Sequence, residues 1–289
     1  MKHLHRLAWI SLLSLVLVVG LSAFMRHVAT GLGCQPWPTC HAQYSGMSGG
    51  ASSLAVSVAR LLHRVVATGT LLLAITMLVI GLRAGPRGRR EAVLAALLLV
   101  LALGLAVLGV FTAGSRLPAV ALGNLLGGFM MLAVAARLVG PPAAPGLGAA
   151  AAGVAVLLVA QSAGGALVSA SQAGLVCNDL RACAELARAA GWPWQALNPW
   201  FAAGLPPVDG ALVQGLHRLA AIVVTLAVAA LGWRALRAGR RPEGWALLLL
   251  LALQAVLGLV VGSIGLPLWA VLLHNLASAL LLALVVRLI

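Results

Sequence analysis

The chain has 289 residues, of which 62% are apolar and 8% charged, and its mean hydropathy is +1.08. This composition excludes a soluble globular domain, while the formal charge of +14 raises the question of an acidic partner. Windows of helix length give about eight apolar runs of roughly 20 residues, each long enough to span a bilayer. The runs lie near residues 8–24, 54–82, 92–111, 119–139, 147–170, 209–233, 244–262 and 267–286. We therefore predict an all-α polytopic membrane protein. Its first run is too long for a cleaved signal peptide.

The placement of the basic residues explains the charge. Twelve of the 19 lysines and arginines fall at the termini or in the even-numbered connections, four on the opposite side, and three in or beside apolar runs. This positive-inside bias predicts a multi-pass protein of a bacterial-type inner membrane, with both termini cytoplasmic. The charge then reflects topology and attraction to the lipid bilayer, and it argues against nucleic acid as a partner.

In chain order, the same series of features occurs twice. Each half has an apolar run, a polar outer loop with two cysteines, a run with a His-Arg dipeptide, a basic turn, an Ala-Val-Leu-Gly run and a run that starts near Leu-Pro. In the first half these features are Cys34/Cys40, His63-Arg64, 106–109 and Leu117-Pro118. In the second half they are Cys177/Cys183, His217-Arg218, 255–258 and Leu266-Pro267. We predict that both prolines lie in the first turn of a helix, where no amide donor is lost.

This repeat predicts two tandem four-helix bundles related by a pseudo-twofold axis along the membrane normal. The N-terminal half is expected at 1–140, a stiff cytoplasmic linker at 141–145, and the C-terminal half at 146–289. Gly140 and the prolines that follow it favour a break in the helices at this joint.

The cysteine pairs, Cys34/Cys40 and Cys177/Cys183, lie on the predicted outer face, where disulfides persist. Five intervening residues allow a tight disulfide loop in each case. The alternatives are a metal site, which favours closer spacing and more ligands, and buried thiols, which do not suit polar loops.

Two histidines of the second half lie at similar depth in predicted membrane helices. His217 is roughly 14 Å and His274 roughly 10 Å from the outer face, at 1.5 Å per residue. Two imidazoles on neighbouring helices can supply both axial ligands of a haem, whereas a single histidine is more often a hydrogen-bonded polar residue. Arg218 is then a candidate for binding a haem propionate, with snorkelling or a structural hydrogen bond as the alternative.

Two glutamines share the spacing Gln-x-x-x-Gly, at Gln161/Gly165 and Gln254/Gly258. Small residues let helices approach closely and glutamine can bond across them, so packing and contact with a cofactor remain equal alternatives.

The first half is asymmetric, because His63 has no second histidine to match it. The expected partner position in the fourth run is Asn124 or Gly123. A haem bound here by one protein ligand leaves an open iron face suited to oxygen chemistry, and the alternative is a site that has decayed. The five carboxylates all lie in loops or at helix ends, which argues against a carboxylate-based ion pump.

Together these features resemble the haem A synthase family of membrane oxidases over nearly the whole chain. The resemblance is strongest at 177–183, 215–219 and 272–274. It implies that His217 and His274 bind haem b, while the N-terminal half oxidises a methyl group of its substrate, haem O, to a formyl group. The product, haem A, serves terminal oxidases. The pair matching Cys34 and Cys40 is linked in that family to catalysis and to electron or substrate handling.

The sequence departs from the family pattern in the first half. Arg60 stands where the family has glutamate, Gly123 or Asn124 where it has histidine, and Leu105 where it has glutamine. The catalytic candidates are therefore His63, as a ligand of the substrate haem iron, with Arg60 and Asn124. Arg64 joins Arg218 as a candidate for cofactor binding.

The leading hypothesis is thus a haem A synthase-like oxidase. Its implied partners are the enzyme that produces haem O, a membrane electron donor and the machinery that assembles terminal oxidases. The alternative is a non-catalytic haem-b protein for electron transfer or oxidase assembly. A transporter has little support, because no broken helix or midplane charge is evident.

Overall fold

The computed structural model describes residues 2–29, 54–112, 115, 117–140, 146–200 and 209–289. Within these ranges there are nine α-helices and no strand, and eight of the helices are long and apolar enough to cross a membrane. The prediction of an all-α polytopic membrane protein is confirmed. Cys34, Cys40 and residues 141–145 lie outside the described residues.

Four long helices come from each half of the chain. Those of the first half, with the short 3-10 helix η1 between α3 and α4, are α1 (Lys2–Ala29), α3 (Leu54–Arg83), η1 (Gly85–Gly88), α4 (Arg89–Phe111) and α5 (Pro118–Val139). Those of the second half, with three short helices in its outer segment, are α6 (Gly148–Ala170), η2 (Ala173–Leu175), α7 (Leu180–Ala189), η3 (Trp194–Leu197), α8 (Gly210–Arg237), α9 (Arg241–Ser263) and α10 (Leu268–Val286).

The helix ends follow local chemistry. Pro118 is the first residue of α5, as predicted, since proline has no amide to donate there. Pro267 stands one residue earlier than predicted, as the extended N-cap of α10. The side chain of Asp179 caps α7 by accepting a hydrogen bond from the amide of Ala182 at 2.8 Å.

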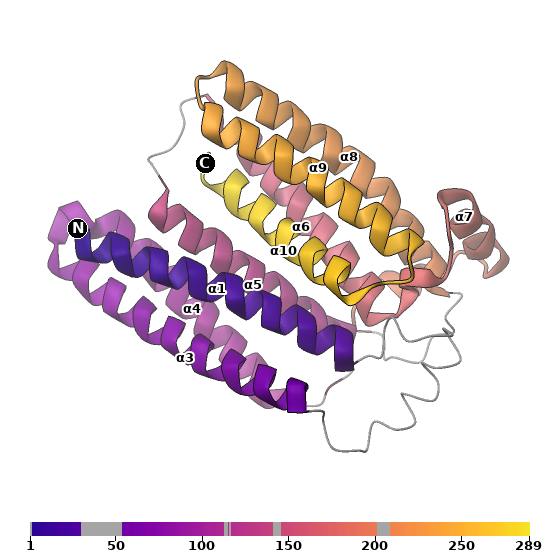
Figure 1. Cartoon of the computed structure of the whole chain (residues 1–289), viewed down its shortest axis with the longest axis horizontal. Helices are drawn as coiled ribbons and strands as arrows, with labels where there is room; N and C mark the ends of the chain where they lie inside the picture. Colours follow the sequence, from indigo (N-terminus) through magenta and orange to yellow (C-terminus); the bar gives the residue numbers. More distant parts are fainter. Residues whose placement is uncertain (1, 30–53, 113–114, 116, 141–145, 201–208) are drawn as a thin grey trace.

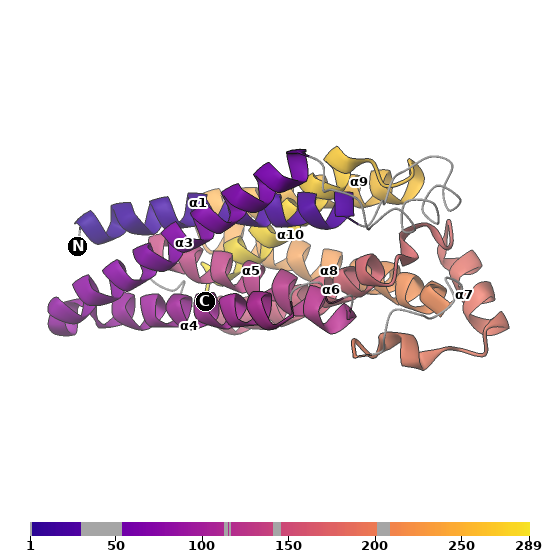
Figure 2. The same cartoon turned by 90° about the horizontal axis from the view of Figure 1, so that it is seen from below.

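The long helices of each half pack as a ring. In the first half α1 contacts α3, α3 contacts α4, α4 contacts α5 and α5 contacts α1; in the second, α6, α8, α9 and α10 follow the same order. The rings meet where α5 and α10 pack together, aided by α1 and α6. Figures 1 and 2 show the eight helices side by side, with α7 at the end opposite the N-terminus.

The core lies at this central contact. Most of the second half of α5 is buried, whereas α4 buries only three small or medium residues and exposes valines and leucines along its length. Leu97 and Val100, for example, are 44% and 65% exposed. An exposed apolar surface of this extent suits contact with lipid.

Close packing of α3 on α4 yields a test of the fold. A methyl group on Gly81 would lie 2.9 Å from the backbone nitrogen of Ala92, whereas one on Gly69 of the same helix meets nothing within 4 Å. We expect Gly81→Ala to separate the helices and lower stability by about 1–3 kcal/mol. Gly69→Ala, the matched control, is expected to preserve stability or raise it. Thermal unfolding in detergent measures both, and equal melting temperatures would contradict the packing shown.

Candidate functional site

His217 of α8 and His274 of α10 stand at opposite corners of the second ring. Both side chains are half-buried, and α8 and α10 each pack on α6 and α9, which lie between them. The predicted placement on neighbouring helices therefore becomes a diagonal one. Both histidines thus belong to one four-helix ring.

Each imidazole lies close to glycine on a neighbouring helix. A methyl group on Gly165 of α6 would lie 3.0 Å from Cε1 of His217, and one on Gly164 would lie 3.3 Å from its Nδ1. On the other side, a methyl group on Gly258 of α9 would lie 3.3 Å from Cε1 of His274. Larger residues would displace the rings, because these spacings are already at or below ordinary contact. The glycine of each Gln-x-x-x-Gly motif thus forms the glycine seat of one histidine, the surface against which its ring packs.

The glutamines of these motifs have different contacts. Nε2 of Gln161 donates to the backbone oxygen of His217 at 3.0 Å, which joins α6 to α8. Nε2 of Gln254 lies 3.3 Å from Nε2 of His274, with donor and acceptor set by the tautomer. Gln161 therefore serves packing, whereas Gln254 contacts the imidazole itself.

The donor atoms of the pair fit a haem with two axial imidazoles. Nδ1 of His217 and Nδ1 of His274 are both buried and have no hydrogen-bond partner among the described residues. Buried polar atoms are normally paired, so two such nitrogens in one ring of helices indicate a missing partner. Coordination of His274 through Nε2 requires the Gln254 amide to turn aside, whereas Nδ1 is already unengaged.

Arg218 connects α8 to the segment that carries Cys177 and Cys183. Its guanidinium donates to the backbone oxygen of Cys177 at 3.0 Å and to that of Asn178. Cys177 and Cys183 form the predicted disulfide, with their Cα atoms 5.1 Å apart. Of the two predicted roles for Arg218, the structure displays the structural hydrogen bond, which holds the disulfide loop against α8.

In the first half, His63 is half-buried on α3, while Arg60 and Arg64 are exposed. His63 lies on the helix that packs against α1, which carries Arg26. The sequence interpretation had placed Arg26 beyond the first membrane run, but it lies within α1 and donates to Oγ of Ser22 at 2.9 Å. The four-residue spacing of Ser22 and Arg26 is the signal for continued helix.

Gly123 and Asn124 are the two positions proposed to match His274, and the asparagines of α5 and α10 make the same local bond. Asn124 donates to the oxygen of Val120 at 3.0 Å, and Asn275 makes the same bond to Val271 at 2.9 Å. This shared bond pairs Asn124 with Asn275, and therefore Gly123 with His274. Asn124 lies on α5, at the corner of the first ring opposite α3 and His63.

Leucines of α4 fill the space at this position. A methyl group on Gly123 would lie 3.0 Å from Cδ2 of Leu108, and one on Gly127 would lie 2.6 Å from Cδ2 of Leu105. Leu105 has the position that Gln254 has in the second half. The first ring is therefore packed with aliphatic side chains where the second holds His274 and its glutamine.

Comparison with protein families identifies a family to which the chain is similar. A family model described as cytochrome oxidase assembly protein (COX15-CtaA) matches residues 62–286. The chain belongs to this family. The match confirms the resemblance drawn from the sequence and supports a general role in cytochrome oxidase assembly. No curated protein matches the chain.

The match includes both His-Arg dipeptides, with α3 from Leu62 onward and all of α8. It begins at Leu62, so His63, His217 and His274 all fall within it, whereas α1 and Arg60 do not. Both residue pairs lie on diagonal helices of a ring: His217 and His274 on α8 and α10, and His63 and Asn124 on α3 and α5.

Proposed function

We propose that this cytochrome oxidase assembly protein is a haem A synthase, which oxidises a methyl group of haem O to a formyl group. We propose further that His217 and His274 bind haem b in the second half. The observation that supports this is the pair of imidazoles at opposite corners of one ring, each with a buried Nδ1 that has no hydrogen-bond partner among the described residues.

The second half then serves electron transfer. A haem with two axial imidazoles supplies one-electron transfer without an open coordination position. His217 and His274 hold it from opposite sides, and the glycine seats set the position of each ring. Arg218 keeps the disulfide loop against the outer end of α8.

The first half binds the substrate. His63 orients haem O through its iron, and the positive charges of Arg26, Arg60 and Arg64 attract the propionates. The proposed oxidant is dioxygen, and a membrane donor supplies electrons. Overall, one methyl group, two O₂, four electrons and four protons give one formyl group and three waters.

The proposed orientation follows from the positive-inside pattern. Both termini and the basic turns lie in the cytoplasm, and the disulfide loop lies on the outer face of the inner membrane. The substrate comes from a haem O-producing enzyme, and the product passes to the machinery that assembles terminal oxidases.

Extraction of haems tests the proposed activity. The chain is expressed with a supply of haem O, and the extracted haems are separated and identified. We expect haem A, or the corresponding alcohol, with His63→Ala as the inactive control. Recovery of haem B and unchanged haem O alone would exclude the oxidase.

The second candidate is a non-catalytic haem-b protein of oxidase assembly. It is favoured by the leucines that fill the first ring at Gly123 and Gly127, where no second imidazole is available. In that case the same extraction yields haem B alone, and the spectrum of a haem with two histidine ligands disappears in His217→Ala.

A further inference from the structure

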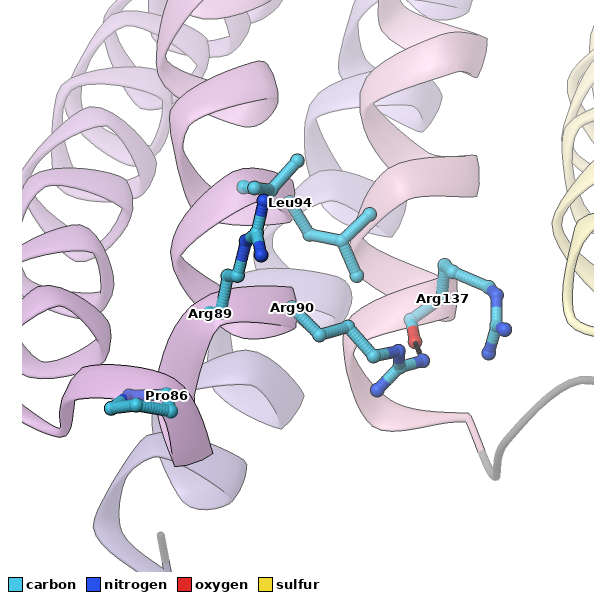
Figure 3. A pocket seen from close by; sticks show the side chains of 6 residues that line it. Pro86, Arg89, Arg90, Leu94 and Arg137 are labelled. Carbon is cyan, nitrogen blue, oxygen red and sulfur yellow. Dashed lines mark hydrogen bonds between the residues drawn. The ribbon is translucent and has the colours of Figure 1, made fainter.

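An open cavity lined by arginines lies between α4 and α5, and none of its lining residues is a histidine. Its volume is about 580 Å³, and its lining consists of Pro86, Arg89, Arg90, Val93, Leu94 and Arg137. Figure 3 shows Arg90 reaching from α4 to the backbone oxygen of Arg137 on α5. That bond measures 2.8 Å. The turn between α3 and α4, from which Pro86 joins the lining, lies at the same end of the bundle as the N-terminus (Figure 1).

The lining has a strong excess of positive charge. Three arginines and no acidic residue line the cavity within the described part of the chain. Arg90 pairs loosely with Glu91, at 3.7 Å. Across residues 2–29, 54–112, 117–140, 146–200 and 209–289, the guanidinium of Arg89 has no hydrogen bond or ion pair, so its donors are available to a ligand. Guanidinium groups favour phosphate, since their forked donors match its oxygens.

An apolar track leads from the cavity along the outside of α4. Val93 forms part of the lining and is 61% exposed, and Leu97 and Val100 continue its face of the helix at 44% and 65%. Residues spaced by three and four positions share one helix face. A charged recess at the end of a membrane span, followed by an apolar strip, matches a phospholipid with its phosphate in the recess and an acyl chain along the strip.

We propose that this cavity binds the headgroup of an anionic phospholipid. Arg89 donates to the phosphate, and Arg90 and Arg137, which also donate to the backbone oxygens of Arg137 and Ile289, add positive charge. The apolar track favours a lipid over free phosphate, because inorganic phosphate gains nothing from Val93, Leu97 or Val100. The site is independent of the haem chemistry proposed above.

Native mass spectrometry of the full chain in detergent tests the proposal, with phosphatidylglycerol and phosphatidylcholine as probes. We expect a preference for phosphatidylglycerol and a loss of about fivefold in its affinity in Arg89→Gln, the effect of one arginine near a membrane surface. Arg87→Gln is the matched control. It removes the same charge from an exposed residue of η1 that does not line the cavity, and its affinity is expected to change less than twofold.

Three results would overturn the proposal. They are equal binding of the two lipids by the unaltered chain, an equal loss of affinity in Arg87→Gln and Arg89→Gln, and complete displacement of phosphatidylglycerol by millimolar inorganic phosphate. The last would indicate a simple anion site. Thermal unfolding of Arg89→Gln verifies that the fold is intact, as expected for an exposed side chain without partners among the described residues.

Discussion

Replacing His217 with alanine is expected to abolish the absorption spectrum of a haem with two histidine ligands. His217 and His274 lie on opposite corners of the second ring, so one cannot replace the other. The purified protein is expected to lose most of its bound haem B. Reduced-minus-oxidised spectra and haem content per chain measure the effect.

Two further variants distinguish loss of a ligand from loss of fold. His3→Ala removes an exposed histidine at the far end of α1 and is expected to leave haem content unchanged. His217→Met retains a ligand and is expected to keep some haem while raising its reduction potential, since methionine-histidine ligation favours the reduced state. A full haem complement with an unaltered spectrum in His217→Ala would contradict the assignment.

His63→Ala is expected to stop formation of haem A while the haem b spectrum remains. His63 lies in the first ring, whereas the proposed haem b lies in the second, so its loss affects only the substrate. Misplacement of a substrate by about 1 Å costs on the order of a hundredfold in rate, and we expect at least that loss. Quantified haem A per chain, beside the spectrum of the same sample, measures it.

Leu62→Ala is the matched control for this variant. Leu62 precedes His63 on α3, is 46% exposed and carries no group that binds iron. Product formation is expected to persist in it. Equal haem A yield in His63→Ala and the unaltered chain would remove His63 from the site. A simultaneous loss of the haem b spectrum would show that the two halves are not separate in function.

The candidate site was partly predictable from the sequence. The His-Arg helices, the Cys177–Cys183 disulfide and the two Gln-x-x-x-Gly motifs all follow from spacing along the chain. The roles of the two motifs do not follow from spacing. A spacing shows which residues share a helix face, but not which residues of other helices that face contacts. Gln161 reaches a backbone oxygen and Gln254 an imidazole, although their motifs are alike.

The sequence by itself determined the eight membrane spans and the repeat. Hydropathy and length are properties of each segment alone, so the predicted runs agree with the helices to within a few residues at most ends. Hydropathy did not predict the end of α1. The predicted run stops before the charged Arg26, whereas the helix continues to Ala29. Hydropathy does not detect the bond from Arg26 to Ser22 one turn earlier.

Only the tertiary structure decided which residues meet. The faces of a membrane helix are nearly all apolar, so periodicity does not tell which one turns toward a neighbour. The diagonal placement of His217 and His274, the glycine seats beneath them and the leucines beside Gly123 all depend on contacts between helices. Those contacts arise from the close fit of small and large side chains across helices that are distant in sequence.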